Sequence, residues 1–238
     1  MEYNVYIPSK GRAGKVTSHK LFLDSTIICP NDEVNDYKKH HNKVIGVDIN
    51  IKGITKTRNW ILENIKDKWH IQVDDDAISF YKHENGKTNN FIDKNKIHKI
   101  LTNQFYIADG WGLKAWGLAL ASDYKFYREY QPFSTQKMVG ANIIGIIKNP
   151  IRFDERLKVK EDYDYSMQHI EKYGGILRYM KYGIDVIHLT NQGGCVSYRT
   201  KDIEMNAYET LKKKWGTKIV ILTNNKNFLR LKSPRKGI

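Results

Sequence analysis

Trp69-His70-Ile71-Gln72-Val73-Asp74-Asp75-Asp76 is the stretch of this 238-residue sequence that decides the fold. Its first five residues include aromatic and β-branched side chains and predict a strand. Three aspartates follow directly, and such close carboxylates repel one another unless a cation or hydrogen-bond donors compensate. Ligands of open α/β sheets bind beyond the carboxyl ends of the strands. We therefore expect the three aspartates at the edge of a binding crevice.

Strands and helices alternate upstream of this stretch. The predicted strands cover 3–7, 26–29 and 43–47, and the predicted helices cover 32–39 and 55–65. Most of these runs end at Pro, Gly or Asn residues, which break regular structure. Alternation at this spacing is typical of an α/β fold with a parallel sheet.

The chain downstream is less regular. Residues 97–120 predict a helix followed by a loop, and residues 137–147 predict a strand pair or hairpin. A helix is expected over 160–173 and a further strand over 182–188. Because neither a repeat nor a linker interrupts the sequence, we expect residues 1–238 to form a single domain.

The composition excludes several classes of protein. Lys and Arg number 40 against 26 Asp and Glu, a formal charge of +14. No apolar run approaches the roughly 18 residues of a membrane span, and residues 1–4 do not begin like a secretory signal. The 2 cysteines cannot build a disulfide scaffold. We expect a soluble cytoplasmic protein, without a membrane partner, that binds a polyanion.

Much of the positive charge lies in a basic C-terminal segment, residues 211–238, which contains no acidic residue. Apolar residues are interleaved with its lysines and arginines, so it is expected to be folded with one basic face. Such a face would contact a phosphate backbone in a salt-sensitive manner. A solvated surface is the alternative.

Adjacent carboxylates at a strand end suit a divalent cation. Mg²⁺ and Mn²⁺ prefer carboxylate oxygens and share their other positions with substrate phosphates. The residues Asp74, Asp75 and Asp76 therefore predict a metal that holds a diphosphate. The alternative is an acidic loop in which Asp76 caps a helix that begins at Ala77.

Two further groups of polar residues are candidates for a functional site. Arg58 lies near the first turn of the predicted helix 55–65, where it could help the helix N-terminus to bind an anion, or simply be exposed. Glu161 and Asp162 begin another helix, where the helix dipole alone favours acids. One of them could instead be a general base for an acceptor hydroxyl, with Asp162 the first choice and Glu161 the second.

Several motifs in this order resemble those of the GT-A glycosyltransferases, which use nucleotide sugars. Within them, the sequence is most similar to the phage-encoded TET-associated group, which glycosylates hydroxymethylated pyrimidines in DNA. The motifs are Ile7-Pro8-Ser9-Lys10-Gly11-Arg12, Thr57-Arg58-Asn59-Trp60, Asp74-Asp75-Asp76, Glu161-Asp162-Tyr163-Asp164 and Asn191-Gln192-Gly193-Gly194-Cys195.

The resemblance implies a GT-A-like (Rossmann-like) fold with a central, mostly parallel sheet flanked by helices. It implies a metal-dependent hexosyl- or pentosyltransferase whose donor is a UDP-sugar. The residues implied to bind the nucleotide sugar are Pro8, Ser9, Lys10, Arg12, Arg58, Asp74 and Asp75. Asp76 would ligate Mn²⁺ or Mg²⁺, and His188 would complete the metal site unless it is a core histidine.

A DNA acceptor would use the basic excess and exposed aromatic side chains. A hydroxymethyl group on a pyrimidine lies in the major groove, and the base must be unstacked or flipped to reach an active site. Trp111, in the loop 109–112, is the main candidate for stacking, although core packing is the alternative. The candidates for phosphate contacts are Lys212, Lys213 and Lys214.

Other functions stay open at this point. The acceptor could be a glycan or a protein instead of DNA. The same acids with a metal could also serve a nucleotidyltransferase or a nuclease. If the chain is phage-encoded, the enzyme would work in the host cytoplasm.

Overall fold

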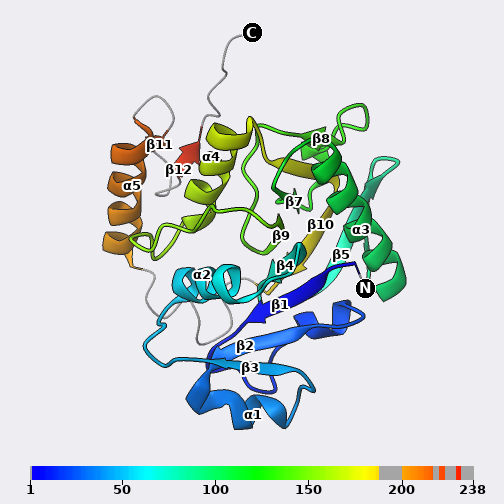
Figure 1. The fold of residues 1–238 in the computed structure, drawn as a ribbon. Helices are drawn as coiled ribbons and strands as arrows, with labels where there is room; N and C mark the ends of the chain where they lie inside the picture. The colour runs from blue at the N-terminus through cyan, green and yellow to red at the C-terminus, as the bar shows by residue number, and fades with distance from the viewer. Residues whose placement is uncertain (1, 188–199, 217–219, 223–228, 232–238) are drawn as a thin grey trace.

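The computed structural model describes residues 2–187, 200–216, 220–222 and 229–231. Within them, a ten-stranded sheet has the strand order β3-β2-β1-β4-β9-β7-β10-β5-β6, with β8 paired to β10 (Figure 1). In chain order its strands are β1 (Asn4–Pro8), β2 (Thr26–Pro30), β3 (Val44–Val47), β4 (Trp69–Val73), β5 (Ala77–Glu84), β6 (Lys87–Phe91), β7 (Ala115–Ala119), β8 (Phe133–Ser134), β9 (Ile143–Ile147) and β10 (Leu177–Val186).

The sheet is mixed but mostly parallel. Strands β3, β2, β1 and β4 form a parallel block, and β9 joins β4 in the opposite direction. On the other side of β9, β7 and β10 run parallel to each other. Central strands are covered on both faces and read as continuous apolar runs, as the fully buried β9 shows. The α/β fold with a central, mostly parallel sheet is confirmed.

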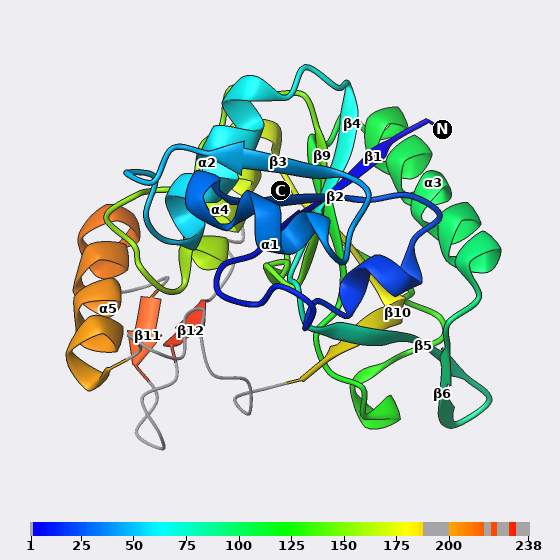
Figure 2. The ribbon, with the colours of Figure 1, turned by 90° about the horizontal axis from the view of Figure 1, so that it is seen from below.

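Helices cover both faces of this sheet (Figures 1 and 2). The helices are α1 (Val34–Lys38), α2 (Ile54–Asn64), α3 (Lys94–Gly110), α4 (Glu161–Tyr173) and α5 (Lys201–Trp215), with short 3-10 turns at Ser18–Leu21, Asn31–Glu33 and Tyr124–Phe126. One face packs on α1 and α3, and the other packs on α2 and α4. The result is a three-layer arrangement, with α5 placed outside α4.

The predicted elements of the first 73 residues are confirmed to within a few residues. Further along, one prediction is wrong and one alternative is excluded. Residues 137–147 hold the single strand β9 instead of a strand pair. Asp76 does not cap a helix, because Ala77 begins strand β5, which forms a hairpin with β6.

The C-terminal region is described only in part. Strands β11 (Val220–Leu222) and β12 (Leu229–Leu231) form an antiparallel pair inside the basic segment 211–238. His188 and the motif 191–195 lie outside the described residues. Of the helices that are described, none is long and apolar enough to cross a membrane.

Polar side chains gather where strands β1, β2 and β4 end, and this side of the sheet is the edge referred to below. Pro8, Pro30 and Asp74 lie at or just beyond the ends of β1, β2 and β4, and the parallel pairing brings these ends together. Because β9 is antiparallel to β4, Asn142, which precedes β9, reaches the same edge, where its carbonyl accepts a 3.1 Å hydrogen bond from Asp74 N. A cavity opens there.

Candidate active site

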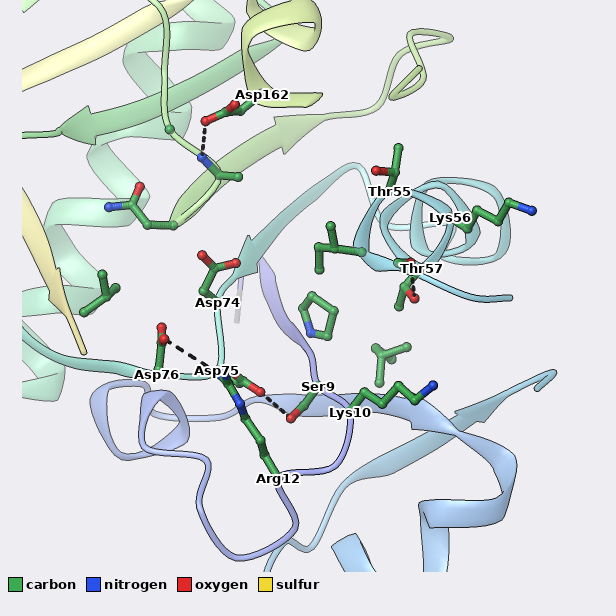
Figure 3. Close-up of a pocket in the computed structure, with 18 of the residues that line it drawn as sticks. Ser9, Lys10, Arg12, Thr55, Lys56, Thr57, Asp74, Asp75, Asp76 and Asp162 are labelled. Carbon is green, nitrogen blue, oxygen red and sulfur yellow. Dashed lines mark hydrogen bonds and ion pairs between the residues drawn. The ribbon is translucent and has the colours of Figure 1, made fainter. Parts of the chain in front are cut away.

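The cavity at this edge has a volume of about 1160 Å³. It is lined by the loop after β1, the first turn of α2, the three aspartates after β4 and the start of α4 (Figure 3). The predicted site residues that line it are Pro8, Ser9, Lys10, Arg12, Asp74, Asp75, Asp76 and Asp162. Segments that are far apart in the sequence therefore meet in one space.

The loop after β1 holds Asp75. Ser9 Oγ donates a 2.5 Å hydrogen bond to one carboxylate oxygen of Asp75, and the Arg12 guanidinium pairs with the other. Tyr37 Oη lies 2.8 Å from Ser9 Oγ and accepts a 3.1 Å hydrogen bond from Arg12 N. These donors compensate the charge of a buried carboxylate. Asp75 thus links the first loop to the acidic stretch.

Arg58 lies elsewhere than expected. Its side chain is 0% exposed and does not line the cavity. Instead, one guanidinium nitrogen donates to Asp74 Oδ1 at 2.7 Å and to the Ala141 carbonyl at 2.8 Å. Arg58 therefore orients Asp74 from within the protein and does not reach a ligand in the cavity.

Its neighbour Asn59 acts in a similar way. The Asn59 side chain exchanges hydrogen bonds with the backbone of Phe153, at 2.9 Å to its carbonyl and 2.8 Å from its N–H. Thr55 Oγ1 donates to the Leu157 carbonyl at 2.8 Å. Helix α2 thereby fixes residues 153–157, the segment that leads into α4.

Replacing Arg58 by Met should destabilise the fold by about 3 kcal/mol, because Asp74 would lose its buried counter-charge. Lys39→Met is the control, since it breaks an exposed 2.6 Å pair with Asp36 and should lower the free energy of unfolding far less. Urea unfolding of both variants measures the two effects. Equal losses would mean that the Arg58–Asp74 pair contributes no more than a surface pair.

Asp74 carries a perturbed carboxyl group. Its side chain is 38% exposed, and that exposure is to the cavity. Removal from bulk water raises the pKa of Asp74 to about 7, and the neighbouring charges of Asp76, Asp75 and Asp162 act in the same direction against Arg58. A cation at this point would relieve that repulsion.

Asp76 is suited to hold a metal ion. Its carboxylate lines the cavity, and Arg12 lies 3.7 Å from one of its oxygens. Across the described part of the chain, no three Asp, Glu, His or Cys side chains converge as ready-made ligands. The aspartate oxygens fit a hard cation such as Mn²⁺ or Mg²⁺, which takes its other ligands from phosphates and water. His188 lies outside the described residues.

Asp162 lines the cavity, whereas Glu161 does not. The Asp162 carboxylate accepts hydrogen bonds from Ala141 N at 3.3 Å and Tyr163 N at 3.0 Å, and burial raises its pKa. Burial likewise raises the pKa of Glu161 to about 7, with the charge of Asp162 adding to the effect. Of the two candidates for a base, Asp162 is the one that faces the cavity.

Most of the basic residues of the cavity were not predicted from the sequence. Lys52, Lys56 and Lys158 line it together with the predicted Lys10. Lys56 belongs to the first turn of α2, where the backbone N–H groups of a helix attract anions (Figure 3). Because the sequence predicts a helix over 55–65, the position of Lys56 in its first turn was the available signal for this residue.

Two predictions about DNA contacts are not supported by the structure. Trp111 is 53% exposed but precedes β7, whose other end reaches the cavity through Leu120. It lies at the opposite edge of the sheet. Lys214 is exposed, but its Nζ is turned toward the protein and lies 2.7 Å from the buried carboxylate of Asp164. Lys213 is exposed, and Lys212 pairs with Glu209 at 3.7 Å on the surface of α5.

Comparison with protein families gives one match. The family model described as "TET-Associated Glycosyltransferase" matches residues 3–194. This range includes all the residues that line the cavity. No curated protein matches the sequence.

Solved structures share the fold. Staphylococcus aureus TarS 1–349 in complex with UDP-GlcNAc has a TM-score of 0.53 and 16% identity, covering 90% of this chain and 65% of that one. The mannosyltransferase PcManGT from Pyrobaculum calidifontis, with GDP-Man and Mn²⁺, has a TM-score of 0.54 and 10% identity, covering 89% and 64%. The chain thus spans less than two thirds of either protein.

A third structure is matched over more of its length. Glucosyl-3-phosphoglycerate synthase from Mycobacterium tuberculosis, in complex with Mn²⁺, UDP-glucose and phosphoglyceric acid, has a TM-score of 0.53 and 10% identity. The match covers 97% of this chain and 86% of that one. At such identities the likeness concerns the fold.

Proposed function

The chain belongs to the TET-associated glycosyltransferase family, and we propose on this basis that it transfers a sugar from a nucleotide diphosphate sugar to the hydroxymethyl group of a modified pyrimidine in DNA. Residues 1–238 are proposed to form one enzyme domain with the basic segment 211–238 at its end. Membership in a glycosyltransferase family argues against the nuclease and nucleotidyltransferase alternatives.

One observation carries the proposal. A single cavity of about 1160 Å³ contains an acidic edge at Asp74 and Asp76, a set of lysines, and the separate carboxylate of Asp162. Transfer from a nucleotide sugar needs these groups together: charge compensation for the leaving diphosphate and a base for the acceptor hydroxyl.

The donor is proposed to lie across the ends of the parallel strands. Lys10, in the loop after β1, and Lys56, at the start of α2, both line the cavity (Figure 3). Both can neutralise phosphate oxygens, and the N-terminus of α2 adds the positive end of a helix dipole. UDP-sugars are bound in two of the three similar structures, which favours a UDP-sugar donor here.

The metal is proposed to be Mn²⁺ or Mg²⁺, held by Asp76 with Asp74 close by. When bound, it supplies positive charge that offsets the charge of the leaving diphosphate. Arg58 keeps the Asp74 carboxylate in place, and Ser9 and Arg12 keep Asp75 in place beside it. The acidic edge is therefore held rigid before a ligand arrives.

Asp162 is proposed as the general base. The hydroxymethyl oxygen of the acceptor must lose a proton as it attacks the anomeric carbon of the sugar, and a carboxylate within about 3 Å can accept that proton. The two backbone N–H groups that bind Asp162 orient its carboxylate toward the cavity. Attack from the side opposite the diphosphate would invert the anomeric centre.

The acceptor DNA is proposed to approach over the loop after β7. Leu120 and Ser122 line the cavity, and the loop continues to Phe126 and Tyr130, which are 60% and 84% exposed. Exposed aromatic rings in a loop that begins at the cavity suit the stacking of an unpaired or flipped base. Tyr127 of the same loop is buried and belongs to the core.

Replacing Phe126 and Tyr130 by Ala should raise the KM for modified DNA about tenfold or more, since a stacked base contributes roughly 1–3 kcal/mol. Tyr106→Ala is the matched control, because this 54% exposed aromatic lies on α3 and does not line the cavity. Steady-state kinetics with a DNA oligonucleotide measures both. An unchanged KM in the double variant would exclude this loop from the DNA surface.

A glycan or protein acceptor is the alternative within the same enzyme class. The basic excess of the chain, +14 overall, favours the polyanionic acceptor. With DNA as acceptor, the enzyme would act in the cytoplasm, which is that of the host if the chain is phage-encoded.

A thermal-shift panel of nucleotide sugars, each with and without Mn²⁺, tests the donor half of the proposal. A ligand that binds only the folded protein raises its melting temperature. We expect a UDP-sugar to give the largest rise and to require Mn²⁺ for it. If no nucleotide sugar shifts the melting temperature under either condition, the proposed donor is wrong.

A further inference from the structure

Helix α5 packs against the beginning of α4 (Figures 1 and 2). Residues 201–215 of this helix lie beyond the range 3–194 that the family model matches. Its apolar face meets the segment that enters α4, and the buried side chains of this contact are Leu157, Val159, Ala207 and Leu211. Two polar connections flank this apolar contact.

The first connection is at Lys160, the residue just before α4. Lys160 Nζ pairs with Glu204 Oε2 of α5 at 3.1 Å, and both side chains are largely buried. Lys160 has a φ of +61°, in the left-handed region that residues other than glycine rarely adopt. Such a conformation persists only where its surroundings enforce it. The bond to Glu204 is one of those constraints.

The second connection is at Asp164, which is fully buried in the first turn of α4. One of its carboxylate oxygens accepts a 2.9 Å hydrogen bond from Trp215 Nε1 and lies 2.7 Å from Lys214 Nζ. Gln168 donates to the other oxygen at 2.7 Å. A buried carboxylate with a cation and two further donors is strongly held, and removing one partner is costly.

These two connections lie two residues on either side of Asp162. We propose that α5 is a clamp that positions Asp162 for proton transfer, with Glu204 and Lys214 as its positioning residues. The inference rests on the proposed function, since it assigns a task to residues that act through the proposed base. It also gives Lys214 a different task from the DNA contact predicted from its charge.

The size of the effect follows from the geometry of proton transfer. A base acts only within hydrogen-bond reach of the hydroxyl. A displacement of about 1 Å can lower a rate by two orders of magnitude. Loosening one connection should therefore reduce kcat, while the donor site, formed by β1, α2 and the acidic edge, keeps its affinity.

Glu204→Gln and Lys214→Met test the clamp, because each removes one ionic connection and keeps the size of the side chain. Their matched controls are Glu209→Gln, an exposed acid on the same helix, and Lys214→Arg, which keeps the cation. We expect kcat to fall about tenfold or more in the two test variants, with KM for the nucleotide sugar within about twofold of wild type. Both controls should stay close to wild type.

Two results would overturn the clamp. The first is a wild-type kcat in both test variants with only a lower melting temperature, which would make α5 a simple stabilising element. The second is a higher KM for DNA at unchanged kcat in Lys214→Met, which would return Lys214 to the DNA surface. Melting temperatures of all four variants establish that they are folded at the assay temperature.

Two further measurements separate this inference from the proposed function. If DNA is not the acceptor, kcat of the test and control variants can be compared instead by their hydrolysis of the nucleotide sugar without DNA. Hydrogen exchange of the amides of residues 160–166 needs no activity at all. If the wild type neither transfers nor hydrolyses sugar, the proposed function fails. Faster exchange in Glu204→Gln than in Glu209→Gln would then still support the clamp, and equal exchange would overturn it.

Discussion

Asp162→Asn is expected to lower kcat by about two to four orders of magnitude, the range in which a positioned general base contributes. Asparagine has nearly the same size and can still accept a hydrogen bond from Tyr163 N or Ala141 N, so the fold should persist. It cannot accept the proton of the hydroxymethyl group. Steady-state transfer to modified DNA measures kcat, and titration calorimetry should show unchanged affinity for the nucleotide.

Glu171→Gln serves as the control, since this exposed acid lies on the same helix, α4. The wild-type rate should also fall in acid, because the base must be ionised and burial raises the pKa of Asp162. The Asn variant should lack the acidic limb that is due to Asp162. Full activity in Asp162→Asn would contradict the assignment and would transfer the role to another group, with Glu161 the first to examine.

Asp76→Ala is expected to abolish metal-dependent turnover, with a loss of about three orders of magnitude or more if the metal contributes several kcal/mol. The substitution removes a carboxylate that lines the cavity and leaves the Ser9 and Arg12 bonds of Asp75 in place. The fold should therefore survive. Activity measured as a function of Mn²⁺ concentration, with calorimetric titration of Mn²⁺, gives the result.

Asp109→Ala is the corresponding control. Asp109 pairs with Lys68 at 3.0 Å close to Trp111, at the edge of the sheet away from the cavity. This variant should bind Mn²⁺ and turn over as the wild type does. Wild-type Mn²⁺ affinity and activity in Asp76→Ala would show that the metal is held by other residues.

The first half of the fold could be predicted from the sequence because each of its strands and helices is marked by its own residues. Strands β1 to β4 are short apolar runs with clear breaks, and parallel pairing requires their carboxyl ends to meet. This was sufficient to bring the loop after β1 and the three aspartates to one edge. The position of the cavity follows from the same strand directions.

The role of Arg58 was mistaken for a reason that helix geometry explains. Residues 55, 58, 59 and 62 follow the spacing of one helical face, and this face of α2 is turned toward the protein. An arginine on that face needs an internal anion, which Asp74 provides. The first-turn residue Lys56 lies off this face and lines the cavity instead.

Trp111 was misplaced because strand β7 was not predicted. A loop with Asp, Gly and Trp looks exposed from its composition alone, and it is exposed. Its position relative to the cavity depends on the direction of the strand that follows, which is set by pairing with β9 and β10. Such long-range pairing leaves no local signal in the sequence.

The ion-pair partner of Lys214 could likewise not be predicted from the sequence. Three consecutive lysines read as a basic surface, and Lys213 and Lys214 are exposed as expected. The partner of Lys214 is Asp164, 50 residues earlier in the chain. Only the packing of α5 on α4 brings the two together.

Transfer of sugar to hydroxymethylated DNA tests the central claim most directly. Two oligonucleotides of one sequence, with either hydroxymethylated or unmodified pyrimidines, are incubated with the enzyme, Mn²⁺ and a panel of nucleotide sugars. The masses of the resulting nucleosides are then measured by mass spectrometry. The account predicts that one donor adds a single sugar residue to the hydroxymethylated pyrimidine and none to the unmodified one. No sugar on either oligonucleotide, from a folded enzyme that binds the donor, would contradict the account.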